Sequence, residues 1–291
     1  MRLGIIGAGK AGVSMGRYLR QSEDVSLTGF FSRTIESARE GADFTDSRAY
    51  TDIDEMVRES DTILIATPDG EITGVWEQLK PLIPDDREMT VGHLSGALSS
   101  EIFSGAEKAN IHGISVHPVY AFADRFTCWE GLNTAFFTLE GSEKAVNLWK
   151  TVLSDLGNRT ASIDAASKVR YHAACAMASN DVLGLIKVCV DNLKLCGFAE
   201  DEAYSLLEHL VKNNVDNAFR AGVVDSLTGP IERNDTGTVK KHLSVMGEYS
   251  TLYKELGKAV LDIATEKHAD IDYSELKEVL EYDRLAVNDH L

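Results

Sequence analysis

The stretch LGIIGAGKAGVSMGRYL at residues 3–19 decides the fold class. A short apolar run is followed at once by Gly7, Gly9 and Gly12 in the pattern G-x-G-x-x-G, and then by a helical pattern. In such a strand–turn–helix unit the first glycine makes the turn, the second lets backbone N–H groups approach a pyrophosphate, and the third packs helix against strand. The alternative is a glycine-rich turn that only packs. We predict that the loop binds a dinucleotide through Gly7, Ala8, Gly9, Lys10, Ala11 and Gly12.

The end of the second apolar run indicates which dinucleotide is bound. A domain that selects NAD carries a carboxylate there for the ribose 2′-hydroxyl, whereas this chain has Ser32, Arg33 and Thr34. An arginine can pair with a 2′-phosphate as a planar fork that is always charged. The alternative is a solvated turn with an incidental arginine. The sequence therefore predicts NADP(H) as the cofactor.

Apolar runs alternate with helical patterns as far as residue 163, at 3–6, 25–31, 62–67, 89–94, 113–117, 134–139 and 159–163. This alternation is typical of a doubly wound parallel sheet, the α/β Rossmann class. Only one of the five prolines, Pro230, lies after residue 120, and the rest of the chain has a helical pattern. We predict an NADP-binding domain over 1–163 and an all-α domain over 164–291 for substrate binding and dimerisation.

Composition limits the partners of the chain. The 291 residues include 46 acidic and 29 basic ones, a net charge of −17, and no basic run, which argues against nucleic acid or an anionic membrane surface. The four cysteines form no CxxC pair, and no signal peptide or unbroken apolar run of 18 residues is apparent. We expect a cytoplasmic protein with reduced thiols. No set of side chains has metal-ligand spacing, so no metal site is predicted.

Three segments follow strands and should reach the carboxyl edge of the sheet, where such folds bind ligands. The first, Ala66, Thr67 and Pro68, should lie beside the cofactor. The second contains His117, which suits hydrogen bonding or proton donation to a carbonyl oxygen, or else only fixes the turn before Pro118. The third contains Ser95 and Gly96, where backbone N–H groups could face a substrate anion.

Several motifs together resemble a known family, the Rossmann-like proteins that carry the C-terminal domain of unknown function 2520. They are GIIGAGKAG (4–12), HLSGAL (93–98), GISVHPVYAF (113–122), KVRYHAACAMASN (168–180) and LTGPIERNDTGTVKKHL (227–243). The N-terminal half is also similar to the deazaflavin-dependent NADP oxidoreductase domain. More loosely, it is similar to ketopantoate reductase, pyrroline-5-carboxylate reductase, prephenate dehydrogenase and 3-hydroxyisobutyrate dehydrogenase.

The resemblance implies a nicotinamide cleft between the sheet and the helical domain, with Lys168 as the catalytic lysine. His172 stands where some of these relatives have asparagine. On an ideal helix Lys168, His172, Cys175 and Ser179 share one stripe, and Asn180 lies off it, as a catalytic group or as a buried amide between helices. Lys168 could instead be an ordinary exposed lysine.

Arg233 lies in a tight-turn segment of the second domain. It could grip a substrate carboxylate, or it could cap helix carbonyls or pair with Asp235.

These observations predict an NADP(H)-dependent oxidoreductase that acts on CH–OH or CH–NH donors and reduces a small carbonyl or imine substrate. A 2-oxo acid such as ketopantoate is suggested by the resemblance. Two alternatives remain open: a non-catalytic NADP-binding sensor or scaffold, and a reductase that uses reduced deazaflavin. A homodimer through the helical domain is expected, because VLGLIKVCVDNL (182–193) is more apolar than one helix face can bury.

Overall fold

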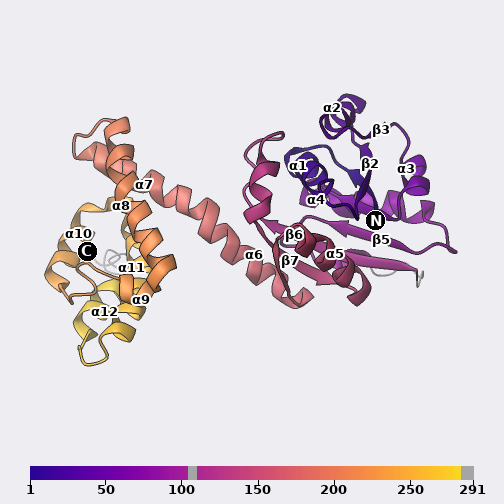
Figure 1. Ribbon diagram of the computed structural model, residues 1–291. Helices are drawn as coiled ribbons and strands as arrows, with labels where there is room; N and C mark the ends of the chain where they lie inside the picture. The colour runs from indigo at the N-terminus through magenta and orange to yellow at the C-terminus, as the bar shows by residue number, and fades with distance from the viewer. Residues whose placement is uncertain (104–109, 283–291) are drawn as a thin grey trace, which may run out of the picture. The chain divides into compact units, whose positions relative to one another are not determined.

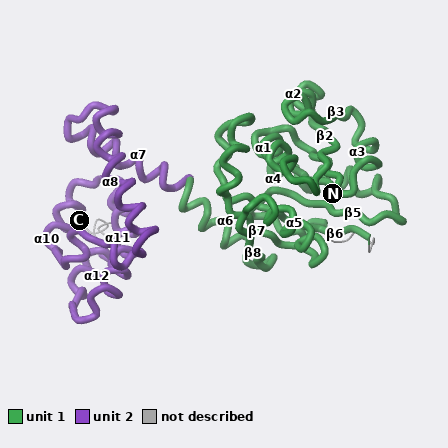
Figure 2. The backbone as a smooth tube through the Cα atoms, in the orientation of Figure 1, with its two compact units in different colours: residues 1–179 green, residues 180–291 purple. Residues whose placement is uncertain are grey.

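The computed structural model describes residues 1–103 and 110–282, and it divides into two compact units, 1–179 and 180–291 (Figure 2). The first unit contains a sheet with helices packed around it (Figure 1), and its eight strands lie in the order β3-β2-β1-β4-β5-β6-β7-β8. The strands are β1 (Arg2–Ile6), β2 (Ser26–Phe31), β3 (Arg48–Tyr50), β4 (Thr62–Ile65), β5 (Met89–His93), β6 (Ile111–Val119), β7 (Phe136–Gly141) and β8 (Arg159–Ser162).

The sheet is parallel from β3 to β6, and β7 pairs antiparallel with β6. The doubly wound fold predicted from the sequence is confirmed, with this one reversal. The connection from β6 to β7 contains only a short 3₁₀ segment, Cys128–Thr134, and a parallel return would need a full crossover. Hydrophobic alternation does not encode strand direction, so the reversal could not be predicted from the sequence.

The helices of the first unit are α1 (Lys10–Leu19), α2 (Ile35–Thr45), α3 (Ile53–Glu59), α4 (Asp69–Leu79), α5 (Glu143–Asp155) and α6 (Lys168–Ala176). Side chains alternate along β4, so that Leu64 joins one buried cluster while Ile63 and Ile65 join another. The first cluster includes Met15 of α1 and Trp149 of α5, and the second includes Met56 of α3 and Trp76 of α4. Helices thus cover both faces of the sheet and leave its carboxyl edge for ligands.

The second unit is helical: α7 (Val182–Leu195), α8 (Glu200–Ala221), α9 (Val223–Ser226), α10 (Thr236–Val245), α11 (Ser250–Lys267) and α12 (Ser274–Glu281). Short 3₁₀ segments lie at Lys80–Leu82, Ser100–Phe103, Ala165–Ser167 and Gly247–Tyr249. The core of the second unit is small, and it contains Val239 of α10, Leu261 of α11 and Leu276 of α12. In contrast, α7 and α8 bury only Val190 and Ala203.

The units divide inside a long helix and not at residue 163. This helix runs over Ala165–Leu195 and contains a π-helical turn, η5 (Met177–Asp181), between α6 and α7. The first turns belong to the sheet unit because Lys168 and Tyr171 bond to β6 and β7, as described below. A helix that begins by packing on the sheet cannot be assigned to the second unit from its periodicity.

By length and composition alone, the helix Ala165–Leu195 could also cross a membrane, and 6% of its most apolar window is buried. Asp181 and Lys187 interrupt it, which is why no unbroken apolar run appears in the sequence.

Candidate active site

The glycine loop has the geometry of a phosphate cradle. Gly7 has a φ of 108°, and a Cβ there would lie 2.7 Å from the carbonyl oxygen of Ala66. A Cβ on Gly12 would collide with the carbonyl oxygen of Gly7, so both positions require glycine for packing. A Cβ on Gly9 would meet nothing within 4 Å. The space over Gly9, at the N-terminus of α1, is therefore open to a phosphate group.

Thr67 supports the same interpretation. Its Oγ1 atom is buried and has no hydrogen-bond partner among the described residues, which is uncommon for a hydroxyl in a native protein. Ala66 and Thr67 follow β4 directly, beside the turn at Gly7. Pro68 precedes α4 and is exposed, as are Gly9 and Lys10, while Ala8 is buried and Ala11 half-buried. A dinucleotide oxygen would satisfy the hydroxyl of Thr67, so these residues fit the cofactor.

The three candidate cofactor-binding residues at the end of β2 have different roles. Thr34 is the N-cap of α2, and its Oγ1 accepts a hydrogen bond of 3.4 Å from the backbone N–H of Ser37. Arg33 is exposed and has no ion pair or hydrogen bond with the part of the chain that the structure describes, and Ser32 is half-buried. Arg33 is thus the charge available to a 2′-phosphate, whereas the hydroxyl of Thr34 is already in use.

Lys168 is a buried ammonium at the carboxyl edge of the sheet. Its side chain starts at α6, and the residue is 1% exposed. The Nζ atom donates to the carbonyl oxygen of Ser95, at 3.1 Å, and to Oγ of Ser115 on β6. An ammonium has three N–H donors, so these bonds leave one for a further acceptor. The interpretation of Lys168 as an ordinary exposed lysine is therefore wrong.

Burial lowers the pKa of Lys168 to about 8, although the carboxylates of Glu140 and Asp69 act in the opposite direction. Such a lysine is still protonated at neutral pH, and it gives up its proton more readily than a solvated one.

The loop after β5 is shaped by the side chain of Ser95. Its Oγ donates to Oδ2 of Asp69 at 2.6 Å and accepts from the backbone N–H groups of Ala97 and Leu98. The N–H of Ser95 itself donates to Nδ1 of His93, at 3.1 Å. These three N–H groups are bonded within the loop. They therefore do not face a substrate anion, which differs from the possibility raised by the sequence. The short side chain of Ser95 folds back over its own loop, as in an ST-turn.

His117 and His172 converge over Gly96. Their ring centroids are 5.7 Å apart, and a Cβ on Gly96 would lie 2.8 Å from Nε2 of His117 and would collide with Nδ1 of His172. Nδ1 of His172 is buried without a hydrogen-bond partner among the described residues. Gly96 therefore leaves room where two imidazole nitrogens meet.

Burial, followed by the nearby positive charge of Lys168, lowers the pKa of His117 to about 4. At neutral pH this imidazole is uncharged, so it cannot be the cationic proton donor that the sequence allowed.

Asn180 and Arg233 lie in the second unit, while Lys168, His117, Ser95, Gly96 and His172 all lie in the first. Asn180 is exposed within the π-helical turn, where the α-helical angles used for the predicted stripe no longer apply. Arg233 is exposed. Asp235 is the N-cap of α10 and bonds Thr238, and these hydrogen bonds, together with the positive charge of Arg233, lower the pKa of its carboxyl.

Several residues of the first-unit site were missed from the sequence. Ser115 could have been found, because it lies two residues before His117 and so shares its face of β6. Tyr171 looked like an ordinary helix residue, and Thr138 like an ordinary strand residue. Asp69 was also missed, although its carboxylate accepts the bond from Ser95.

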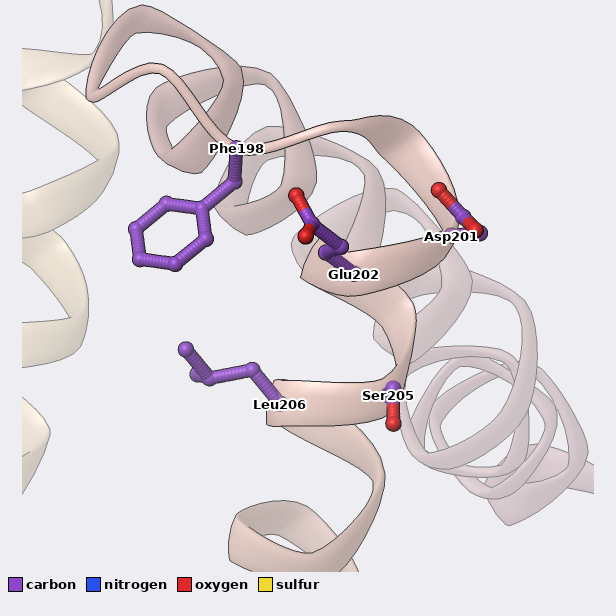
Figure 3. Close-up of a pocket in the computed structure, with 5 residues that line it drawn as sticks. All are labelled: Phe198, Asp201, Glu202, Ser205 and Leu206. Carbon is purple, nitrogen blue, oxygen red and sulfur yellow. The ribbon is translucent and has the colours of Figure 1, made fainter.

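A surface pocket in the second unit is lined by Phe198, Asp201, Glu202, Ser205 and Leu206 (Figure 3). Two carboxylates and no cation line it, so it does not suit a phosphate or carboxylate ligand. Across the described ranges 1–103 and 110–282, no group of three or more His, Cys, Asp or Glu side chains could hold a metal ion.

Comparisons with known proteins agree with this geometry. Residues 1–79 match the model of the oxidoreductase family with an NAD-binding Rossmann fold, and residues 135–260 match a domain of unknown function, DUF2520. The chain joins an NAD(P)-binding Rossmann domain to a DUF2520 domain. The resemblance inferred from the motifs is confirmed. Lys168 and His172 lie within the DUF2520 match, whereas Ser95, Gly96 and His117 lie between the two matches.

Solved structures share the fold over most of the chain. A Thermotoga maritima protein is 26% identical, with a TM-score of 0.72 over 91% of this chain and 99% of that one. A Bacteroides fragilis protein described as an NADP oxidoreductase is 19% identical, with a TM-score of 0.70 over 90% and 98%. A pyrroline-5-carboxylate reductase from Streptococcus pyogenes is 13% identical, with a TM-score of 0.64 over 91% and 98%. No curated protein matches the chain in sequence.

Proposed function

We propose that the protein is an NADP(H)-dependent oxidoreductase that reduces a small carbonyl or imine acid. The observation that carries the proposal is the buried ammonium of Lys168, held by Ser95 and Ser115 at the carboxyl edge of a dinucleotide-binding sheet. Burying an ammonium is costly, so its position calls for a role beyond packing. Perturbed lysines in such positions are common at catalytic sites.

The loop of Gly7, Gly9 and Gly12 would hold NADPH, which would supply the hydride when bound. As a ketone or imine is reduced, negative charge or a new N–H forms on its heteroatom, which requires a donor within about 2.6–3.2 Å. The third N–H of Lys168 is such a donor, and with a pKa of about 8 it can release the proton that completes the reduction. His117 and His172 would bind the same substrate over Gly96.

The substrate class follows from the polar groups. One cation and two imidazoles suit a small molecule with a carbonyl or imine next to a carboxylate, which is a 2-oxo acid or a cyclic imino acid. Ketopantoate is one such acid.

NADP(H) is preferred over NAD(H) in this proposal, because Arg33, and no carboxylate, lies among the three residues that follow β2. The function is also consistent with a cytoplasmic location. The apolar surface that α7 and α8 expose is then covered by a second copy of the chain and not by lipid, because Asp181, Lys187 and Asp191 interrupt the apolar segment. The exposed side chains include Leu183, Leu185 and Leu195 of α7 and Leu206, Leu210 and Phe219 of α8.

Purified protein tests the proposal directly when NADPH oxidation is followed with a panel of 2-oxo acids and cyclic imino acids. We expect turnover with at least one member and none with matched acids that lack the carbonyl or imine. Tight NADPH binding without turnover on any member would favour the sensor or scaffold alternative. Turnover only between NADPH and oxidised deazaflavin, or between NADP⁺ and reduced deazaflavin, would favour the third alternative.

A further inference from the structure

Tyr171 connects His117 to the neighbouring strand. Its hydroxyl lies 2.7 Å from Nδ1 of His117 on β6 and 2.8 Å from Oγ1 of Thr138 on β7. His117 and Thr138 are directly opposite each other in the β6–β7 register. The tyrosine and histidine rings meet edge to face at 85°, with centroids 5.6 Å apart. Three polar side chains from three elements thus form one short chain of hydrogen bonds.

The donor and the acceptor of each of these hydrogen bonds follow from the number of protons on the three side chains. Burial raises the pKa of Tyr171 to about 12, so its hydroxyl keeps its single proton at neutral pH. Thr138 donates to the phenolic oxygen, and the Tyr171 proton then goes to Nδ1 of His117, because an imidazole nitrogen is a far better acceptor than the neighbouring Sγ of Cys175. The imidazole of His117 is uncharged at neutral pH because burial lowers its pKa, and it then carries only one N–H. If Nδ1 accepts, that proton is on Nε2.

We propose that Tyr171 is a positioning residue that fixes His117 in the tautomer protonated on Nε2. His117 then presents an N–H donor, and not a lone pair, to a ligand over Gly96. The proposal rests on the function proposed above only for its ligand, because the tautomer is a property of the protein alone.

His117 and Lys168 would consequently have different roles in the site. A neutral imidazole N–H stabilises a carbonyl oxygen or carboxylate by hydrogen bonding, but it is far too weak an acid to protonate it. The proton must then come from Lys168. The groups that face His117 are Lys168 and His172 from α6, Asp69 from α4 and His93 from β5. With His117 as a fixed donor and Lys168 as the acid, the substrate heteroatom is held from two sides.

The structure contains a matched control in the second unit. His242 and Tyr253 form the same kind of pair, with Nδ1 to hydroxyl at 2.8 Å and ring centroids 5.8 Å apart at 83°. Replacing Tyr253 removes an equivalent hydroxyl without touching the candidate site.

Nitrogen NMR of the full chain labelled with ¹⁵N-histidine tests the tautomer without substrate, with the His117→Asn variant used to assign the signal. We expect His117 to show a protonated Nε2 and an unprotonated Nδ1 at neutral pH. Tyr171→Phe should convert this to a mixture of tautomers, and Tyr253→Phe should leave His117 unchanged. A wild-type signal with the proton on Nδ1, or a Tyr171→Phe signal equal to wild type, would overturn the proposal.

A kinetic arm separates a donor from an acid once a substrate is known. His117→Gln keeps an amide N–H near the Nε2 position, so it should retain about tenfold more kcat than His117→Ala, as expected for one hydrogen bond. Equal loss in both variants would contradict the donor role. Absence of any turnover would defeat the proposed function and leave the NMR result standing.

Discussion

Charged side chains are usually exposed and apolar ones buried, and the two halves of the helix Ala165–Leu195 depart from this rule in opposite ways. At its start, on α6, Lys168 is 1% exposed. Beyond the π-helical turn, on α7, Leu183 and Leu195 are 67% and 86% exposed. A buried ammonium and solvated leucines are each unfavourable in an isolated chain. The difference teaches that the first half places a charged group at the sheet edge, where we propose that it acts on a substrate, while the second half exposes an apolar surface that we propose a second copy covers.

The π-helical turn lies where the two halves meet, at the division of the units between Ser179 and Asn180. Single π turns occur frequently at functional sites. The π-helical turn also ends the stripe formed by Lys168, His172 and Cys175. The extra residue in this turn rotates all later side chains about the helix axis. The two halves can therefore present different faces, one polar and one apolar.

The largest effect expected from this comparison is on turnover. Lys168→Met keeps the apolar stem but removes the ammonium, so we expect kcat to fall by roughly 10²–10⁴-fold while NADPH affinity is unchanged. Lys187→Met makes the same substitution on α7, where Lys187 is exposed and paired with Asp191, and should change kcat less than twofold. Steady-state kinetics and calorimetry measure both. A Lys168→Met enzyme with wild-type kcat would contradict the role of Lys168 in turnover, and with it the contrast between the two halves of the helix.

The next effect is on assembly. Leu183→Asp on α7 introduces a charge into the surface that we expect a second copy to cover, and it should weaken the dimer by roughly 30-fold or more, as for an interface hot spot. The control is Val169→Asp on α6, a position 71% exposed, which should leave the dimer intact. Light scattering across concentrations reports the mass. A wild-type mass of 31.8 kDa at every concentration would show that the protein is a monomer and that no second copy covers α7.

The sequence could predict the features that depend on one local pattern. The loop of Gly7, Gly9 and Gly12 needs only a strand, a turn and a helix, and the structure has all three. It could not predict β3 and α3, because three-residue strands and seven-residue helices carry too little periodicity. Nor could it predict the π-helical turn, because this depends on hydrogen-bond register and not on residue type.

The candidate site was predicted in part for a related reason. Lys168, His117 and Gly96 were found because each follows a recognisable strand or begins a helix. Their partners Tyr171 and Thr138 were missed because the bond between them depends on the reversed strand β7. The internal bonding of the Ser95 loop was missed because a serine after a strand looks the same whether it faces a ligand or its own backbone.

Cofactor choice should be independent of both halves of the helix. Arg33→Asp removes a charge-assisted pair with the 2′-phosphate worth about 1.5–3 kcal/mol, so the preference for NADPH over NADH should fall by roughly 10- to 150-fold. Calorimetry with both cofactors measures the preference. The dimer mass and the kcat at saturating NADPH should stay the same. Equal affinity for the two cofactors in the unchanged protein would show that Arg33 does not select the cofactor.

The smallest effect is a pH dependence that belongs to the first half alone. If Lys168 donates the proton, kcat should be halved near its pKa of about 8 and should fall about tenfold for each further pH unit. Stability should change in the opposite direction. The pKa is lowered from 10.5, so between about pH 8 and 10.5 the unfolded chain binds more protons than the folded one, and stability rises with pH across that window. Lys168→Met should abolish this rise in thermal melts, whereas Lys187→Met should retain it. A wild-type kcat that stays constant from pH 7 to beyond pH 9 would assign the proton to another group and leave Lys168 the role of a fixed charge.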